Sequence, residues 1–88
     1  MLRLWGKIIK NSRIVRDYVA EIGGNDTPTH RIFAALDEIV SVFDLEKPIW
    51  LDSNVRAFRD HRKTRFTQDN FIETIPFDCL EIELLSID

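Results

Sequence analysis

Residues 2 to 22 read LRLWGKIIKNSRIVRDYVAEI, and the alternation within this stretch decides the fold. On both sides of Asn11 and Ser12, strand-forming residues repeat with a period of two, which is typical of β-strands. Asn tolerates the left-handed backbone conformation that a tight two-residue turn needs. The stretch therefore predicts a β-hairpin in which Lys10 faces Arg13 across the turn.

The two-residue turn also sets the register, and with it the residues on each face of the hairpin. We expect one face to line the core, and it carries Leu4, Ile8, Val15 and Val19. On the other face Trp5 lies opposite Tyr18, among Arg3, Lys7, Ile9, Ile14 and Arg16. Trp5 and Tyr18 are therefore candidate binding residues, because apolar side chains away from the core often mark an interface. The alternative is that the segment from Trp50 to Phe66 covers this face within the chain.

A long helix follows the hairpin. Thr27 is a suitable N-cap and Pro28 a suitable first helical residue. Up to Asp44, apolar side chains then recur at helical spacing, at Ile32, Ala35, Leu36, Ile39 and Phe43. We expect these residues to face the sheet, and Arg31, Asp37, Glu38, Ser41 and Asp44 to face solvent.

The second half of the chain gives weaker signals. Residues 49–51 are predicted to be a strand or an extended segment, and Asp52 or Ser53 to cap a short surface helix that ends near Arg62. Residues 64–76 are predicted to form a loop with one helical turn near residues 68–71. Residues 77–87 alternate as a strand, with Glu81 and Glu83 on its outer face.

These elements predict an α+β domain that comprises residues 1–88. We expect two layers: a mostly antiparallel sheet of three to four strands, one long helix packed on one face, and a short surface helix. The last strand must join the hairpin, because an isolated hairpin is barely stable in water. That pairing places Glu81 and Glu83 beside the basic residues Arg3, Lys7 and Arg16.

Length, charge and cysteine content restrict the class of protein. The chain has 88 residues, a formal net charge of -3 and a single cysteine, Cys79, so it predicts one domain without an internal disulfide. The longest apolar run, residues 32–36, is too short to cross a membrane. The first residues lack the apolar region of a secretory signal. We therefore expect a cytoplasmic protein with no membrane partner.

The charge is sorted into blocks, and residues 56–65 carry five basic side chains and one acidic one. The candidate binding residues of this block are Arg56, Arg59, Arg62, Lys63 and Arg65. At helical spacing Arg56, Arg59 and Lys63 share one side, where they could bind phosphate groups. The alternative is a solvated helix end, which is the usual role of such a run.

The sequence offers little chemistry for catalysis or metal binding. His30, His61 and Cys79 lack metal-ligand spacing, and no phosphate-binding loop or nucleophile motif is present. We expect no cofactor, no metal ion and no enzymatic activity. A small RNA-cleaving enzyme is the third hypothesis, because His61 lies among arginines, but such proteins are normally strongly basic.

Three stretches of the chain are similar to other sequences: HRIFAALDEI at residues 30–39, PIWLDSN at residues 48–54 and RFTQDNFIE at residues 65–73. In these stretches it resembles a group of short, uncharacterised bacterial proteins of fewer than about a hundred residues. The resemblance implies a bacterial, cytoplasmic origin. It implies no activity, cofactor or site residue.

The leading functional hypothesis is a non-enzymatic protein-binding or adaptor module, for which a second copy of the chain is one candidate partner. The alternative is a nucleic-acid-binding protein, or a phage-type inhibitor of a nucleic-acid enzyme. That alternative would use the basic block at residues 56–65, or an acidic helix face that mimics phosphate and carries Asp37, Glu38 and Asp44. The net charge of -3 makes a general nucleic-acid binder the weaker hypothesis.

Overall fold

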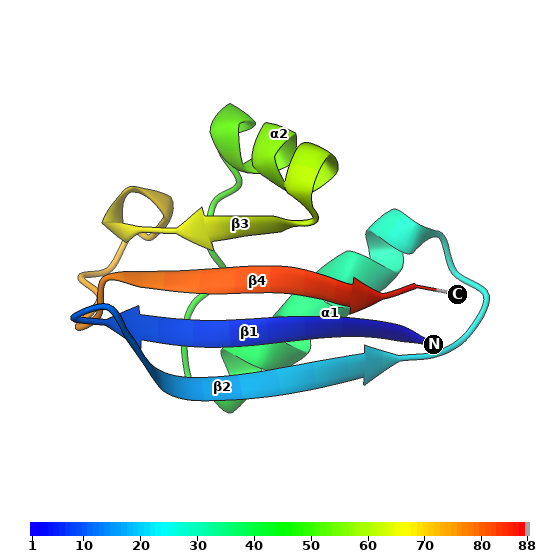
Figure 1. The fold of residues 1–88 in the computed structure, drawn as a ribbon, viewed down its shortest axis with the longest axis horizontal. Coiled ribbons are helices and arrows are strands. Elements are labelled where there is room, and N and C mark those ends of the chain that lie inside the picture. Colours follow the sequence, from blue (N-terminus) through cyan, green and yellow to red (C-terminus); the bar gives the residue numbers. More distant parts are fainter. Residues whose placement is uncertain (88) are drawn as a thin grey trace.

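An open four-stranded antiparallel sheet with the order β2-β1-β4-β3 runs through the computed structural model, which describes residues 1–87 (Figure 1). The strands are β1 (Leu2–Lys10), β2 (Arg13–Ile22), β3 (Lys63–Phe66) and β4 (Cys79–Ser86). The helices are α1 (Pro28–Val42), α2 (Asp52–His61) and the short 3-10 helix η1 (Gln68–Asn70). The predicted α+β class is therefore confirmed, with four strands in the sheet.

The turn between β1 and β2 has the predicted geometry. Asn11 and Ser12 both adopt the left-handed conformation, with φ angles of 53° and 63°. Two successive residues with positive φ form the type of turn whose twist matches that of the flanking strands. Lys10 accordingly pairs with Arg13, as the sequence predicted.

A β-bulge just after this turn changes the faces of β2. Ile9 pairs with Ile14, but Ile8, the residue before it in β1, pairs with Arg16. Val15 is therefore an extra residue of β2 that has no partner in β1. One extra residue moves every later side chain of the strand to the opposite face. The prediction that Val15 and Val19 line the core is therefore wrong, and their side chains are 53% and 39% exposed.

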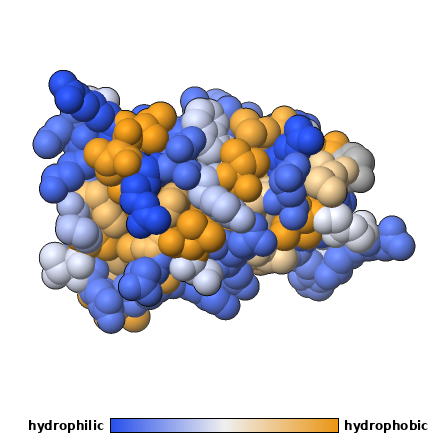
Figure 2. All heavy atoms as spheres, turned by 90° about the horizontal axis from the view of Figure 1, so that it is seen from below, coloured by the Kyte–Doolittle hydropathy of each residue, from blue (hydrophilic) through white to orange (hydrophobic). Residues whose placement is uncertain are grey.

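The residues that replace these two valines near the core are smaller or polar. Ala20, opposite Leu4, is fully buried. Arg16 lies with its guanidinium 5.0 Å from the centre of the Phe43 ring. Figure 2 views the molecule from below Figure 1, along the free side of β2, and shows hydrophobic patches separated by hydrophilic atoms. This edge therefore presents no continuous apolar band.

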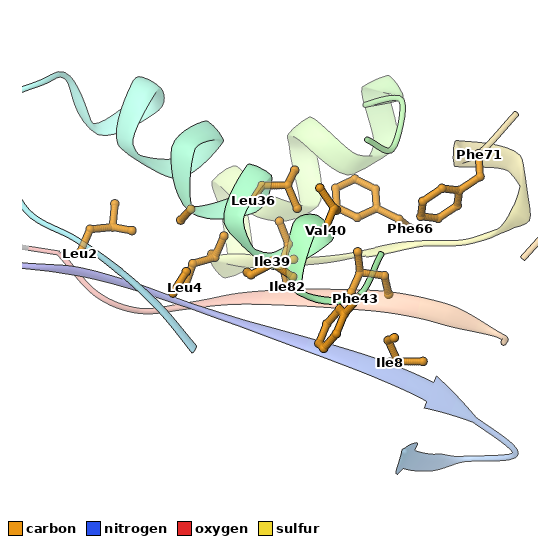
Figure 3. Packing of buried hydrophobic residues seen from close by; sticks show 13 residues of the cluster. Leu2, Leu4, Ile8, Leu36, Ile39, Val40, Phe43, Phe66, Phe71 and Ile82 are labelled. Atoms are coloured by element: carbon orange, nitrogen blue, oxygen red, sulfur yellow. The ribbon is translucent and has the colours of Figure 1, made fainter. Parts of the chain in front are cut away.

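Helix α1 begins as the sequence predicted. Thr27 is the N-cap and its hydroxyl oxygen accepts a hydrogen bond of 3.2 Å from the His30 N–H, while Pro28 occupies the first helical turn. Figure 3 shows Ile39 and the C-cap residue Phe43 directed at the strands, while Leu36 extends from the side of α1; all three belong to the buried hydrophobic cluster, as does Val40. The prediction that Arg31 faces solvent is wrong, because this residue is only 6% exposed and donates a 3.1 Å hydrogen bond to the Ile22 carbonyl oxygen.

The second half of the chain contains a strand that the sequence did not indicate. The prediction of a loop from residue 64 is wrong, because Lys63–Phe66 pairs with β4. Thr64 and Phe66 are buried and alternate with exposed Lys63 and Arg65. Helix η1 lies where a helical turn was predicted. Residues 49–51 form no strand, but the extended backbone of Leu51 agrees with the alternative of an extended segment.

Gly6 marks the closest approach between α1 and the sheet. A Cβ atom at this position would lie 2.5 Å from Cγ2 of the fully buried Ile39, so a methyl group must displace the Ile39 side chain or the elements that carry the two residues. We expect Gly6→Ala to lower the free energy of unfolding by about 1–3 kcal/mol, the usual cost of overpacking. Urea denaturation measures this change, and Gly23→Ala is the matched control because no atom lies within 4 Å of the place that its new methyl group would occupy. Equal stability of the two variants would contradict the close packing.

Leu36 tests how much the buried apolar side chains of α1 stabilise the fold. Its side chain is 3% exposed within the main hydrophobic cluster. Leu36→Ala should lower the free energy of unfolding by about 2–5 kcal/mol, because it removes buried methyl groups and leaves a cavity. Ile72→Ala, at a position that is 83% exposed, should change stability little. A midpoint of urea unfolding that is unmoved by Leu36→Ala would exclude this packing.

Candidate functional site

An apolar groove of about 300 Å³ lies between α1 and α2. Its lining residues are Thr29, Ile32, Phe33, Trp50, Val55, Phe58 and Arg59. Phe33 is 44% exposed and Val55 is 51% exposed, so each helix presents a large apolar side chain to solvent at this groove. Pockets of this size that are mostly apolar are typical of binding sites.

Trp50 connects the groove to the core. Its ring makes edge-to-face contacts with Phe33, Phe58 and Phe66, at centroid distances of 5.9, 5.8 and 5.0 Å. Phe66 is fully buried, whereas Phe33 is exposed. Edge-to-face pairs at these distances stabilise packing beyond the area that they bury. The aromatic wall of the groove is thus anchored in the interior.

The buried side chain of Asn54 holds the first turn of α2 against β3. Its Nδ2 donates to the Thr64 hydroxyl oxygen and to the Arg65 carbonyl oxygen, both at 2.9 Å. Its Oδ1 accepts from the Leu51 N–H at 3.1 Å. Leu51, rather than the predicted Asp52 or Ser53, is therefore the N-cap of α2.

Asn70 extends this network to the segment that carries Trp50. Its Nδ2 donates to Oδ1 of Asn54 and to the Ile49 carbonyl oxygen, both at 2.7 Å. The Ile49 N–H in turn donates to the Asn70 carbonyl oxygen at 2.7 Å. These bonds fix the backbone on either side of the aromatic wall, so the groove is formed before any ligand binds.

The basic block is divided between α2, its C-cap and β3. Arg56 and Arg59 lie on α2, and Arg62 is its C-cap with a left-handed φ of 59°. This conformation turns the chain into β3, which Lys63 begins. The prediction that Arg56, Arg59 and Lys63 share one helix side is therefore wrong. The ion pairs that form within residues 1–87 include none with Arg56, Arg62 or Lys63.

Arg65 belongs to the open face of the sheet, away from the helices. Its Nε donates a 2.8 Å hydrogen bond to Glu81 on the neighbouring strand. The predicted pairing of the glutamates with basic residues is confirmed for Lys7, whose Nζ lies 2.6 Å from Glu81 and 3.0 Å from Glu83. These cross-strand pairs neutralise most of the charge on this face.

Trp5 and Tyr18 lie on opposite faces of the sheet, so the prediction that they face each other is wrong. The bulge places Trp5 opposite Val19, and the indole Nε1 donates a 2.9 Å hydrogen bond to Asp17. The ammonium group of Lys7 lies 3.9 Å from the centre of the Trp5 ring. The indole is thus already engaged within the chain.

Tyr18 instead faces α1. Its hydroxyl group donates a 2.8 Å hydrogen bond to Glu38, and this bond raises the pKa of Tyr18. The alternative, in which the segment from Trp50 to Phe66 covers this face of the hairpin, is also wrong. Trp50 and Phe66 pack with the hydrophobic core, and β3 extends the sheet instead of covering it.

Other chemistry is sparse in the described part of the chain. Residues 1–87 contain no group of three or more His, Cys, Asp and Glu side chains placed to hold a metal ion. Cys79 is 5% exposed, and burial raises the pKa of its thiol. The helices within residues 1–87 are all too short or too polar to span a membrane.

Comparisons with known proteins find no match to a family model, a curated protein or a solved structure. The site is therefore inferred from geometry alone. The groove was not predicted from the sequence, although two residues signal it. Phe33 widens the apolar stripe of α1 beyond the width that the sheet can cover, and Val55 gives the surface helix an apolar residue with no predicted partner.

The stability of the sheet face should depend on pH through Glu81. Burial opposes ionisation of this carboxyl group, but hydrogen bonds from Lys7 and Arg65 outweigh burial and hold its pKa below the ordinary value of 4.5. A lowered pKa in the folded state stabilises the protein above pH 4.5, and the stabilisation is lost as the pH falls through the folded-state pKa. Glu81→Gln should lower the free energy of unfolding at neutral pH by about 1–3 kcal/mol.

The variant should also lose less stability than the wild type as the pH falls below 4.5, which urea denaturation across this range measures. Glu73→Gln is the control, because Glu73 is exposed and forms no ion pair within residues 1–87. Parallel pH profiles for the wild type and Glu81→Gln would show that this carboxylate contributes nothing to the acid sensitivity.

Proposed function

We propose that this protein is a small, non-enzymatic cytoplasmic module that binds another protein through the groove between α1 and α2. One observation carries the proposal: Phe33 and Val55 are both exposed beside an apolar hollow of about 300 Å³. A concave apolar surface with aromatic walls is the kind of site in which a partner inserts a large side chain. The scaffold that we propose has two layers, with α1 as a long helix on one sheet face and α2 as a short helix at the surface.

The composition of the groove supports binding more than catalysis. Arg59 is the one ionisable residue among those that line it. General acid–base chemistry needs groups such as His, Glu or Asp within reach of the reacting atoms. The Asn54 and Asn70 network fixes the wall in advance, and a preformed site loses less conformational entropy on binding.

Nucleic-acid binding is the second candidate function. It is favoured by Arg56, Arg62 and Lys63, which are exposed and form no ion pair within residues 1–87. Mimicry of phosphate by α1 has less support, because Asp37 pairs with Lys47 at 3.3 Å and Glu38 accepts a hydrogen bond from Tyr18. Affinity for nucleic acid must fall steeply as salt rises, whereas an apolar contact does not weaken in this way.

Val55→Asp tests the protein-binding function. The side chain is half exposed, so the substitution should change stability by no more than about 0.5 kcal/mol, yet it places a charge in the apolar groove. We expect at least about a tenfold loss of affinity for proteins captured from the native host. Ile72→Asp, at an exposed apolar position outside the groove, should leave capture intact. Sedimentation velocity of the same variants shows whether the captured partner is a second copy of the chain. Identical capture by both variants would exclude the groove as the binding surface.

A further inference from the structure

We infer that the groove recognises an acidic amphipathic segment of its partner, with a large apolar side chain in the hollow and a carboxylate at Arg59, an inference that rests on the protein-binding function proposed above. The segment is defined by chemistry: one aromatic or large aliphatic anchor with Asp or Glu beside it. Two independent features of the groove support this recognition: the shape of the hollow and the charge at its rim.

The shape of the hollow fits a single large side chain. Its volume of about 300 Å³ lies at the lower end of the range for small-ligand pockets. Ile32, Phe33, Val55 and Phe58 supply apolar surface from two neighbouring helices. A partner helix or extended segment lying over such a surface contributes one anchor residue and leaves its other side chains near the rim. Those neighbouring side chains then meet whatever charge the rim carries.

The charge at the rim is positive and available. Arg59 has a side chain that is 68% exposed, and its Nε lies 3.2 Å from Asp60. No hydrogen bond formed within residues 1–87 uses its two terminal nitrogens. A guanidinium group has five N–H donors and binds a carboxylate through two parallel hydrogen bonds. Arg59 can therefore keep its contact with Asp60 and still bind a carboxylate of the partner.

Two further cations flank Arg59 in the chain, one on α2 and one at its C-cap. Arg56 precedes Arg59 by three residues and Arg62 follows it by three, and both are exposed without an ion pair in the described chain. The three residues of α1 in the groove lining, Thr29, Ile32 and Phe33, are uncharged. An acidic segment is attracted to this arrangement and a basic one is repelled, so the rim selects the sign of the partner's charge.

The test is selection of a random peptide library displayed on phage against the full chain, followed by calorimetry with the enriched peptides made synthetically. We expect the enriched peptides to share Leu, Phe or Trp next to Asp or Glu. Val55→Asp should weaken their binding at least about tenfold. Arg59→Glu should weaken it about three- to tenfold, because attraction between exposed charges becomes repulsion.

A charge exchange makes the test specific. Replacing the acidic residue of the peptide by Lys should restore affinity for Arg59→Glu and reduce it for the wild type. Arg13→Glu is the matched control, since Arg13 is an equally unpaired, exposed cation at the hairpin turn. It should change affinity less than about twofold, because charges farther apart than a Debye length are screened. Circular dichroism of each variant confirms that the fold is retained.

The possible failures are distinguishable. One result would overturn this inference and leave the proposed function standing. In that result the enriched peptides lose affinity for Val55→Asp, but they show no preference for acidic residues and bind Arg59→Glu as well as the wild type. Absence of enriched peptides, or peptides whose affinity survives Val55→Asp, would overturn both. A third result would overturn both the inference and the proposed function in favour of nucleic-acid binding. In that result a single-stranded oligonucleotide binds more tightly than any enriched peptide, and Arg56→Glu abolishes its binding.

Discussion

The hydrogen bond between the side chains of Asn54 and Asn70 is the contact on which the placement of α2, β3 and the segment around Trp50 depends. At 2.7 Å it links the first turn of α2 to η1, and each amide also bonds to the backbone of a third segment. Buried amides are costly unless every donor and acceptor is satisfied, and here their bonds are made within the chain. The placement of α2, of β3 and of the aromatic wall around Trp50 follows from this pair.

Most charged side chains of the sheet are likewise paired within the fold. Sorted blocks in the sequence suggest a strong field, but folding places the basic residues of β1 and β3 beside the glutamates of β4. Lys7 is only 5% exposed and contacts both Glu81 and Glu83, so it stabilises the sheet and is not accessible to a partner. The exposed cations without an ion pair in the described chain include Arg56 on α2 and Arg62 at its C-cap, close in sequence to Arg59 in the groove lining. Because the charges on the open face of the sheet pair with one another, the positive rim of the groove is the distinctive charged feature on the side of the sheet that carries the helices.

The sequence predicted the elements whose signals are local. Thr27 and Pro28 mark the start of α1, and Asn11 with Ser12 marks the turn, because capping and turn conformations depend on the residues themselves. Strand β3 could not be predicted in this way, since its four residues are held by β4 and by Asn54, which are distant in sequence. No residue near Val15 indicates the bulge, and one missed residue reversed the faces of β2. The groove was missed for a related reason, because it needs two helices whose relative placement only the tertiary structure determines.

The sheet order has a consequence for how the chain acquires its structure during synthesis. The hairpin of β1 and β2 can form early, but β1 is a central strand whose other neighbour is β4, with Leu4 paired to Leu84. Until the last strand is synthesised, the second edge of β1 stays open and Leu2, Leu4 and Ile8 lack part of their cover. Contacts of such high sequence separation slow folding, and open strand edges favour aggregation while they persist. The nascent chain is therefore most vulnerable until β4 has been synthesised and has paired with β1.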